Sequence, residues 1–216
     1  MSESPVLLSV DAEVGIGTIT LNRPKALNAL NRELSIALRE AVCRVEHDQA
    51  VRALVIQGAG NHFMAGGAVR AFHETLAETE TVRKLYFEHF IAEVHDTITR
   101  IRRMEKPVVA SVRGAAAGIG HSLMNSCDLA IAADDAYFTM AYRNIGASPD
   151  GGGTYTLPRL VGTKRAMEIA LLSERFDAER ALELGLINRV VPAAALVEAT
   201  RSWALHLAAG PTRALG

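Results

Sequence analysis

A continuous apolar run at residues 53–57, ALVIQ, constrains the fold more than any other segment of this chain. The run does not alternate between apolar and polar residues, and it ends at Gly58. Such a run is typical of a strand that helices cover on both faces of a sheet. Amphipathic helical patterns at residues 31–47 and 81–104 stand on either side of it. These segments together predict an α/β fold.

Other segments extend this alternation in both directions along the chain. Two β-rich runs at residues 7–10 and 16–21 flank a polar turn and predict a hairpin. Pro107 ends the second helical pattern, and a strand is expected at residues 108–112. A helix from about residue 120, a strand at 129–132 and several helices after residue 154 follow. We therefore expect a core at residues 1–162 and a helical C-terminal region at 163–216.

Composition excludes several classes of function. With 23 basic and 24 acidic residues the formal charge is -1, so no bulk field attracts nucleic acid or an anionic membrane. The two cysteines, Cys43 and Cys127, lack the spacing of a disulfide framework or a zinc site. No signal peptide or membrane span is expected, and a cytoplasmic location fits best. A short basic helix end, which we interpret as a solvated face, contains Arg100, Arg102, Arg103 and Lys106.

Two glycine-rich segments are the candidate functional loops. Residues 61–68, NHFMAGGA, follow a strand, and residues 113–123, RGAAAGIGHSL, join a strand to a helix. Free NH groups at a helix start favour negative charge, so the two loops together can clamp one oxygen atom. Taken singly, each loop is better interpreted as a tight turn. A dinucleotide fingerprint is weakened because its third glycine position is Leu123, and no GxSxG elbow surrounds Ser122.

The sequence resembles the crotonase, or enoyl-CoA hydratase/isomerase, superfamily in five segments that occur in the family's order. They are GTITLNRPKALNAL at 17–30, FMAGGAV at 63–69, residues 106–120, CDL at 127–129, and residues 146–162. The resemblance implies a spiral of ββα turns with a helical C-terminal region. Family members usually continue for several more helices than this sequence does, so a shortened C-terminal region is expected. The family also implies a homotrimer or a hexamer.

The resemblance further assigns the parts of a CoA-thioester site. Two backbone NH groups, at Gly67 and Ile119, would form an oxyanion hole for the thioester carbonyl. Many family members have aspartate at the position of Ala68. Coenzyme A would enter as part of an acyl-CoA substrate, with no prosthetic group and no metal. Residues expected to bind the substrate are Lys25, Ala26, Leu27, Ala65, Ala68, Val69 and Tyr142.

The expected reaction follows from the acidic residues that are present. Family hydratases use two glutamates, and Ser122 and Tyr142 occupy those positions here. Hydration uses the pair because one group orients water while a proton is delivered to carbon, so ordinary hydration is disfavoured. Asp150 stands where several family isomerases have their single catalytic acid. The interpretation of Asp150 as part of a Pro-Asp-Gly turn or as a helix cap remains open.

Three other functions remain as alternatives. The first is an enoyl-CoA hydratase with an atypical site. The second is a reaction like that of 4-chlorobenzoyl-CoA dehalogenase, in which Asp150 would attack the ring and His95 would act as base. Histidine also occurs at that position in isomerase-like relatives, and His95 could simply be a partly buried helix residue. The third is a noncatalytic acyl-CoA binding module.

Overall fold

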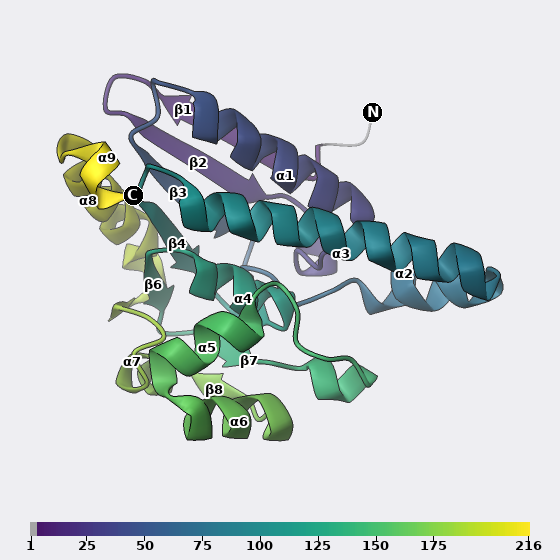
Figure 1. The fold of residues 1–216 in the computed structure, drawn as a ribbon. Helices are drawn as coiled ribbons and strands as arrows, with labels where there is room; N and C mark the ends of the chain where they lie inside the picture. Colours follow the sequence, from purple (N-terminus) through teal and green to yellow (C-terminus); the bar gives the residue numbers. More distant parts are fainter. Residues whose placement is uncertain (1–3) are drawn as a thin grey trace.

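The computed structural model describes residues 4–216 and contains two β-sheets surrounded by helices (Figure 1). Within this range the larger sheet has six strands in the order β1-β2-β3-β4-β6-β9. β1 and β2 form the expected antiparallel hairpin, and every other neighbouring pair in this sheet is parallel. The strand bounds are β1 Val6–Asp11, β2 Ile16–Leu21, β3 Ala53–Gly58, β4 Val108–Val112, β6 Leu129–Ala133 and β9 Arg189–Val191.

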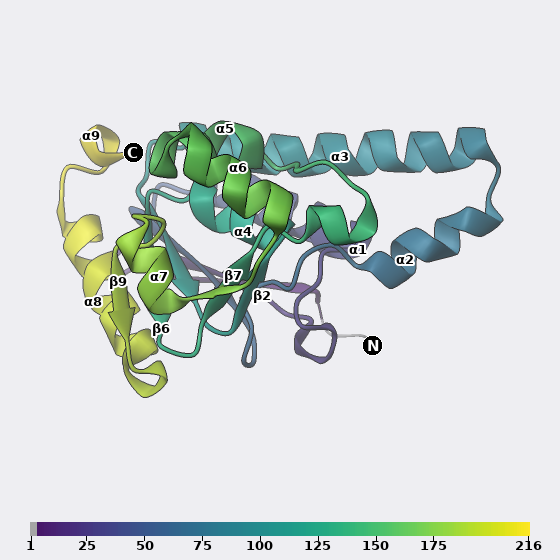
Figure 2. The same cartoon turned by 90° about the horizontal axis from the view of Figure 1, so that it is seen from below.

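Both faces of β3 are buried, as the apolar run predicts. Leu54 and Ile56 pack into the main core, which also holds residues of α1 (Arg32–His47) and α3 (Glu80–Arg103). Ala53 and Val55 point to the other face and pack against α8 (Leu196–Ala209). α1 and α3 lie side by side in both views (Figures 1 and 2). The strand therefore lies between two layers of helices, which is why it has no polar face.

The smaller sheet begins within the second glycine-rich segment, at β5. Its order is β5-β7-β8, with β5 parallel to β7 and β8 antiparallel to it. The sequence did not predict these strands or β9, because each has only two or three residues and is defined by its pairing partner. Strands β8 and β9 lie within residues 163–216, where the sequence predicted helices; the division at residue 162 remains a prediction. The bounds are β5 Ala115–Ala117, β7 Tyr137–Thr139 and β8 Phe176–Asp177.

The remaining helices complete the α/β arrangement. α4 begins directly after β5, and α5, α6 and α7 lie around the smaller sheet (Figure 2). The sequence also did not predict α2, which with the first turns of α3 projects from the body in both views (Figures 1 and 2). Their bounds are α2 Val69–Glu74, α4 Ile119–Ser126, α5 Gly153–Val161, α6 Thr163–Leu172, α7 Ala178–Glu183 and α9 Thr212–Leu215, with 3-10 turns η1 Pro24–Ala26, η2 Thr75–Ala77, η3 Tyr142–Ile145 and η4 Ala193–Ala195. None of the helices in residues 4–216 is long and apolar enough to cross a membrane.

Lys106 does not lie on a solvated face, so that part of the sequence interpretation is wrong. Its side chain is buried, and Nζ donates to the carbonyl oxygens of Val45, at 2.5 Å, and Asp48, at 2.7 Å. Burial lowers the pKa of Lys106, and the nearby Asp48 and Glu46 partly oppose this. A lysine near the end of a helix can satisfy its last carbonyl groups, which the helix itself leaves without donors. Lys106 thus joins the end of α1 to the start of β4.

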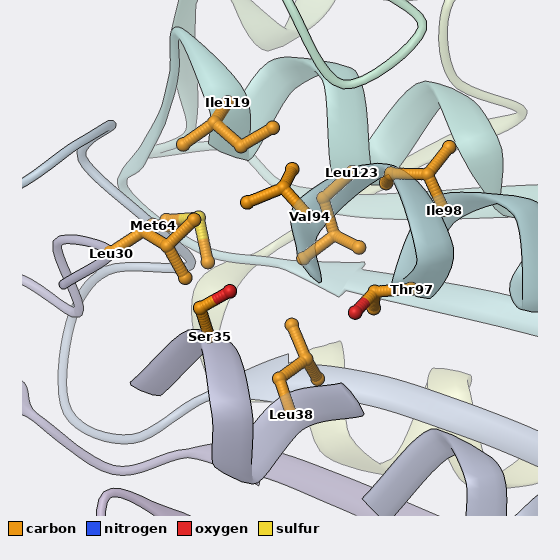
Figure 3. A pocket seen from close by; sticks show the side chains of 9 residues that line it. All are labelled: Leu30, Ser35, Leu38, Met64, Val94, Thr97, Ile98, Ile119 and Leu123. Carbon is orange, nitrogen blue, oxygen red and sulfur yellow. The ribbon is translucent and has the colours of Figure 1, made fainter. Parts of the chain in front are cut away.

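A void of about 10 Å³ lies between α1, α3 and α4, close to the two glycine-rich loops. Apolar side chains form most of its wall, including Met64, Val94 and Ile119 (Figure 3). The Ser35 hydroxyl points into this space and has no hydrogen-bond partner among the described residues. A buried polar group without a partner costs free energy on folding.

We predict that Ser35→Ala leaves the free energy of unfolding unchanged or raises it by up to about 1 kcal/mol, because the variant no longer buries an unpartnered hydroxyl. Urea unfolding measures the change. Leu38→Ala on the same wall is the contrasting variant and should lose about 2–5 kcal/mol. A loss of more than about 1 kcal/mol in Ser35→Ala would indicate that the hydroxyl is hydrogen-bonded in solution.

Candidate active site

A parallel backbone pairing brings the two glycine-rich loops together. The NH of Met64 donates to the carbonyl of Ala115, and the NH of Ala117 donates to the carbonyl of Met64, both at 2.9 Å. Met64 thereby pairs with Ala116 at the centre of β5. The two backbones run in the same direction from this pair, and Gly66 and Gly118, two positions beyond it, still lie against each other. Gly67 and Ile119 each stand three positions beyond it.

Glycine allows the two backbones to remain in contact beyond the paired residues. Gly66 and Gly118 have φ angles of +98° and +50°, in the region that favours glycine. A Cβ atom on Gly66 would lie 3.4 Å from the Ala117 carbonyl oxygen, and one on Gly118 would lie 3.7 Å from the Gly66 Cα. The loops therefore touch through their backbones rather than through side chains.

The NH groups of Gly67 and Ile119 have no protein acceptor anywhere in residues 4–216. Leu30 bonds to the residues on either side of Gly67, since its NH donates to Gly66 and its carbonyl accepts from Ala68, both at 2.8 Å. In a parallel pairing this pattern turns the NH of the middle residue away from the partner. Ile119 is the first residue of α4, where helix geometry leaves the NH free and the helix dipole favours negative charge.

These two residues lie in the wall of a pocket of about 800 Å³. Such a volume is typical of small-molecule sites. Its lining comes from α2 and α3, from the two glycine-rich loops and from residues 141–150. Its lining residues include Leu30, Ala65, Gly66, Gly67, Val69, Phe72, Phe87, Phe90, Gly118, Ile119, Tyr142 and Asp150. The pocket is mostly apolar, and Asp150 is the only carboxylate among those of its lining residues that the structure describes.

Close packing of Gly151 against Ile119 brings Asp150 to this pocket. A Cβ atom on Gly151 would lie 2.3 Å from the Ile119 Cδ1 atom, and the φ angle of Gly151 is +55°. The left-handed φ angle favours glycine, and a Cβ atom would have to displace the end of the Ile119 side chain. The carbonyl of Asp150 accepts from the NH of Gly153, at 2.9 Å, which closes a turn. Asp150 therefore lies in a turn, as one interpretation expected. Its side chain does not cap α5, so the helix-cap interpretation is wrong.

The Asp150 carboxylate instead accepts a hydrogen bond from the Tyr142 hydroxyl, with 2.6 Å between Oη and Oδ1. Ser122 contacts the backbone of the same residue, because its hydroxyl donates to the Asp150 carbonyl at 3.0 Å, and it lies 3.5 Å from Tyr142 Oη. Burial raises the pKa of Asp150, and the Tyr142 hydrogen bond and the charge of His95 partly oppose the rise. Burial and the neighbouring carboxylate raise the pKa of Tyr142, so its hydroxyl stays a donor.

The other predicted substrate-binding residues divide into two groups. Ala65 and Val69 line the pocket together with Tyr142. Ala68 is half-buried beside them and is not part of the lining. Lys25, Ala26 and Leu27 are exposed and form a turn outside the pocket. The NH of Ala65 donates to the Leu27 carbonyl at 3.0 Å and so joins this turn to the first glycine-rich loop.

The predicted base His95, a buried histidine and a possible metal-binding group lie outside the pocket lining. His95 is exposed on α3, and it affects Asp150 through its charge without lining the pocket. His121 is fully buried, and burial lowers its pKa to about 4, so it is neutral near pH 7. On α1, one ligand atom from each of Cys43, Glu46 and His47 lies within 4.8 Å of the others. The Glu46 carboxylate is already bonded to Arg100 at 2.6 Å, so we assign no metal site there.

Sequence reasoning missed two parts of the site. The first is the set of aromatic rings from α2 and α3 that line the pocket, since nothing in the sequence indicated that α2 exists. The second is Asn28, which is fully buried with a φ angle of +54°. Its Oδ1 accepts from the NH of Arg23 at 2.8 Å, and its Nδ2 donates to the carbonyls of Ala59, at 3.0 Å, and His62, at 2.6 Å. Asn28 thereby joins the exposed turn to the first glycine-rich loop.

Comparison with known proteins places this geometry among acyl-CoA enzymes. Residues 11–215 match the family model for enoyl-CoA hydratase/isomerase. The chain is 39% identical over 204 residues to 1,2-epoxyphenylacetyl-CoA isomerase of Escherichia coli K12, covering 94% of this chain and 77% of the relative. It is 34% identical over 215 residues to 4-chlorobenzoyl coenzyme A dehalogenase-2 of an Arthrobacter species, covering 100% and 77%.

A solved structure agrees with the family match. The crystal structure of an enoyl-CoA hydratase/isomerase from Xanthobacter autotrophicus Py2 superposes with a TM-score of 0.89 and 32% sequence identity. The alignment covers 99% of this chain and 77% of that structure. The fold expectation from the sequence is therefore confirmed.

We predict that Asn28→Ala lowers the free energy of unfolding by about 3 kcal/mol or more. The variant leaves one NH and two carbonyl groups without their partner and places alanine in a left-handed conformation. Asn28→Gly loses the same hydrogen bonds, but glycine adopts the left-handed conformation without strain. This variant should therefore lose about 1 kcal/mol less than Asn28→Ala. Urea unfolding of both variants measures the difference. Equal stability of the two variants would contradict a strained backbone at this position.

Proposed function

The chain belongs to the enoyl-CoA hydratase/isomerase family, and from this premise we propose that it is an acyl-CoA isomerase that shifts a carbon–carbon double bond. One observation supports the proposal most. A single carboxylate, that of Asp150, faces the same pocket as the unpaired NH groups of Gly67 and Ile119. One base and two fixed donors are the groups that enolate chemistry requires.

The proposed reaction begins when the two NH groups bind the thioester carbonyl oxygen of a 3-enoyl-CoA. Asp150 removes a proton from C2, and the electron pair moves onto the carbonyl oxygen to form a dienolate. The NH groups stabilise the negative oxygen because they already point to its position. Asp150 then returns the proton to C4, and the double bond moves to C2–C3. The proton count balances, and no water or other reactant is consumed.

Hydration fits this pocket less well. A hydratase of this family needs one group to orient water and a second to deliver a proton. Ser122 and Tyr142 stand at the two glutamate positions, and both act on Asp150 through hydrogen bonds. Asp150 is also the one carboxylate among the described lining residues. These observations favour chemistry that uses one carboxylate.

A dehalogenase-like reaction is the second candidate, because two Arthrobacter dehalogenases are among the relatives. In that reaction Asp150 would attack the aromatic ring, and His95 would activate water. His95 lies exposed on α3 outside the pocket lining, which disfavours its role as the base. Release of halide from 4-chlorobenzoyl-CoA would favour this candidate over the isomerase.

We predict that Asp150→Asn lowers the rate of 3-enoyl-CoA isomerisation by about 10²- to 10⁴-fold, because the amide cannot accept the proton from C2. The conjugated product is followed by absorbance, and deuterium uptake at C2 in heavy water should fall in parallel. Binding of CoA thioesters should persist. Asp11→Asn removes a carboxylate outside the pocket and serves as the matched control. An unchanged rate in Asp150→Asn would show that Asp150 is not the base, whereas wild-type protein that binds CoA thioesters without isomerising them would favour a noncatalytic binding module.

We further predict that Tyr142→Phe moves the acidic limb of the kcat/KM pH profile to higher pH. Asp150 must be ionised to act as a base, so activity falls as pH drops through its pKa, which burial already raises. The Tyr142 hydrogen bond lowers that pKa, and its loss should raise it further. Tyr155→Phe, which alters an exposed tyrosine, is the control. A superimposable profile in Tyr142→Phe would show that this hydrogen bond does not govern the titration.

A further inference from the structure

Aromatic rings form one wall of the pocket. Phe72 on α2 and Phe87 and Phe90 on α3 all line it. The ring centroids of Phe72 and Phe87 lie 5.4 Å apart, and those of Phe72 and Phe90 lie 5.6 Å apart, with 65° between the ring planes in each pair. Three of the chain's six phenylalanines thus meet at a single pocket, in a protein with only 5% aromatic residues.

The aromatic wall begins next to one of the two backbone donors. A Cβ atom on Gly67 would lie 2.6 Å from Cε2 and 2.8 Å from Cζ of Phe72, so the Phe72 ring packs directly against Gly67. A thioester carbonyl bound by the Gly67 NH would therefore lie next to the Phe72 ring. An acyl group held there can extend along this aromatic surface.

Phe90 anchors this wall in the core, and Phe72 and Phe87 are half-buried beside it. Phe90 is 4% exposed and belongs to the main core. Tyr86 supports the wall from behind, because it stacks on Phe90 with 6.1 Å between centroids and meets Phe87 edge-on at 5.3 Å. A preordered wall favours a rigid ligand, since a flexible chain loses more rotational freedom when it is bound.

We propose that this wall selects acyl groups that carry an aromatic ring one or two carbon atoms from the thioester, such as arylacetyl groups. Aromatic rings prefer the edge-to-face and offset contacts that angled neighbouring rings provide. Each such contact is worth about 2- to 12-fold in affinity beyond its apolar area. The inference rests on the proposed function for the position of the thioester and adds the class of acyl group.

A pair of thioesters with equal acyl carbon number tests the inference by binding alone. Phenylacetyl-CoA and octanoyl-CoA both have eight acyl carbons, and neither has the C3–C4 alkene that the proposed isomerisation shifts. Isothermal titration should give a dissociation constant at least about tenfold lower for phenylacetyl-CoA, which corresponds to about two aromatic contacts. Equal affinity, or tighter binding of octanoyl-CoA, would overturn the inference.

Matched variants locate the source of the preference. Phe87→Leu should lower the ratio of the two dissociation constants by about 2- to 12-fold, because leucine offers no ring. Phe176→Leu makes the same change at a half-buried ring of the smaller sheet, outside the pocket lining, and should leave the ratio unchanged. Phe72→Leu provides a second test if Phe87→Leu unfolds. A ratio that stays unchanged in the folded pocket variants would overturn the assignment of this wall.

The outcomes separate this inference from the proposed function. Binding of neither thioester would overturn the proposed acyl-CoA function and this inference with it. Binding of both thioesters with equal affinity would overturn this inference alone. A clear preference for phenylacetyl-CoA in wild type and in Asp150→Asn would support the aromatic subsite even if that variant kept full turnover.

Discussion

The parallel pairing of Met64 with Ala116 is the contact on which the candidate site depends. It holds two loops, more than fifty residues apart in the chain, in the same direction and in step. Gly66 and Gly118 then let the backbones touch, so that the free NH groups of Gly67 and Ile119 reach the same pocket. If this pairing shifted by one residue, the NH groups of Gly67 and Ile119 would no longer be aligned with each other. The donors are therefore part of the sheet architecture rather than of mobile side chains.

A second constraint is the unusual backbone that delivers Tyr142 and Asp150. Ala141 has a φ angle of +51°, a left-handed conformation that costs a non-glycine residue about 1–2 kcal/mol. Such conformations persist where surrounding packing holds them, and they often occur at functional sites. Here Gly151 packs on Ile119 a few residues later, which closes the loop against α4. The cost of this loop is offset by a buried Tyr142–Asp150 hydrogen bond facing the pocket.

Periodicity in the sequence predicted the long elements well and the short ones poorly. The helices at 32–47 and 80–103 begin within one residue of the predicted positions, because a sustained apolar stripe requires burial on one side. The strand at 53–58 was equally clear, since burial on both faces leaves no polar position. β5, β7 and β8 have too few residues for any pattern to emerge, and each exists because a neighbouring strand pairs with it. Lys106 was misplaced because a charged residue gives no local sign that distant carbonyl groups will receive it.

By itself the sequence determined which segments must be buried, where glycine must allow a close approach, and that one acid, Asp150, stands in the motif of a CoA-thioester family. Only the tertiary structure decided which of these residues share a pocket. It brought Ser122, Tyr142 and Asp150 into one hydrogen-bond network, set an aromatic wall beside Gly67, and left His95 outside. The physical reason is that burial is encoded locally through periodicity. Contacts between distant segments depend instead on how whole helices and strands pack against one another.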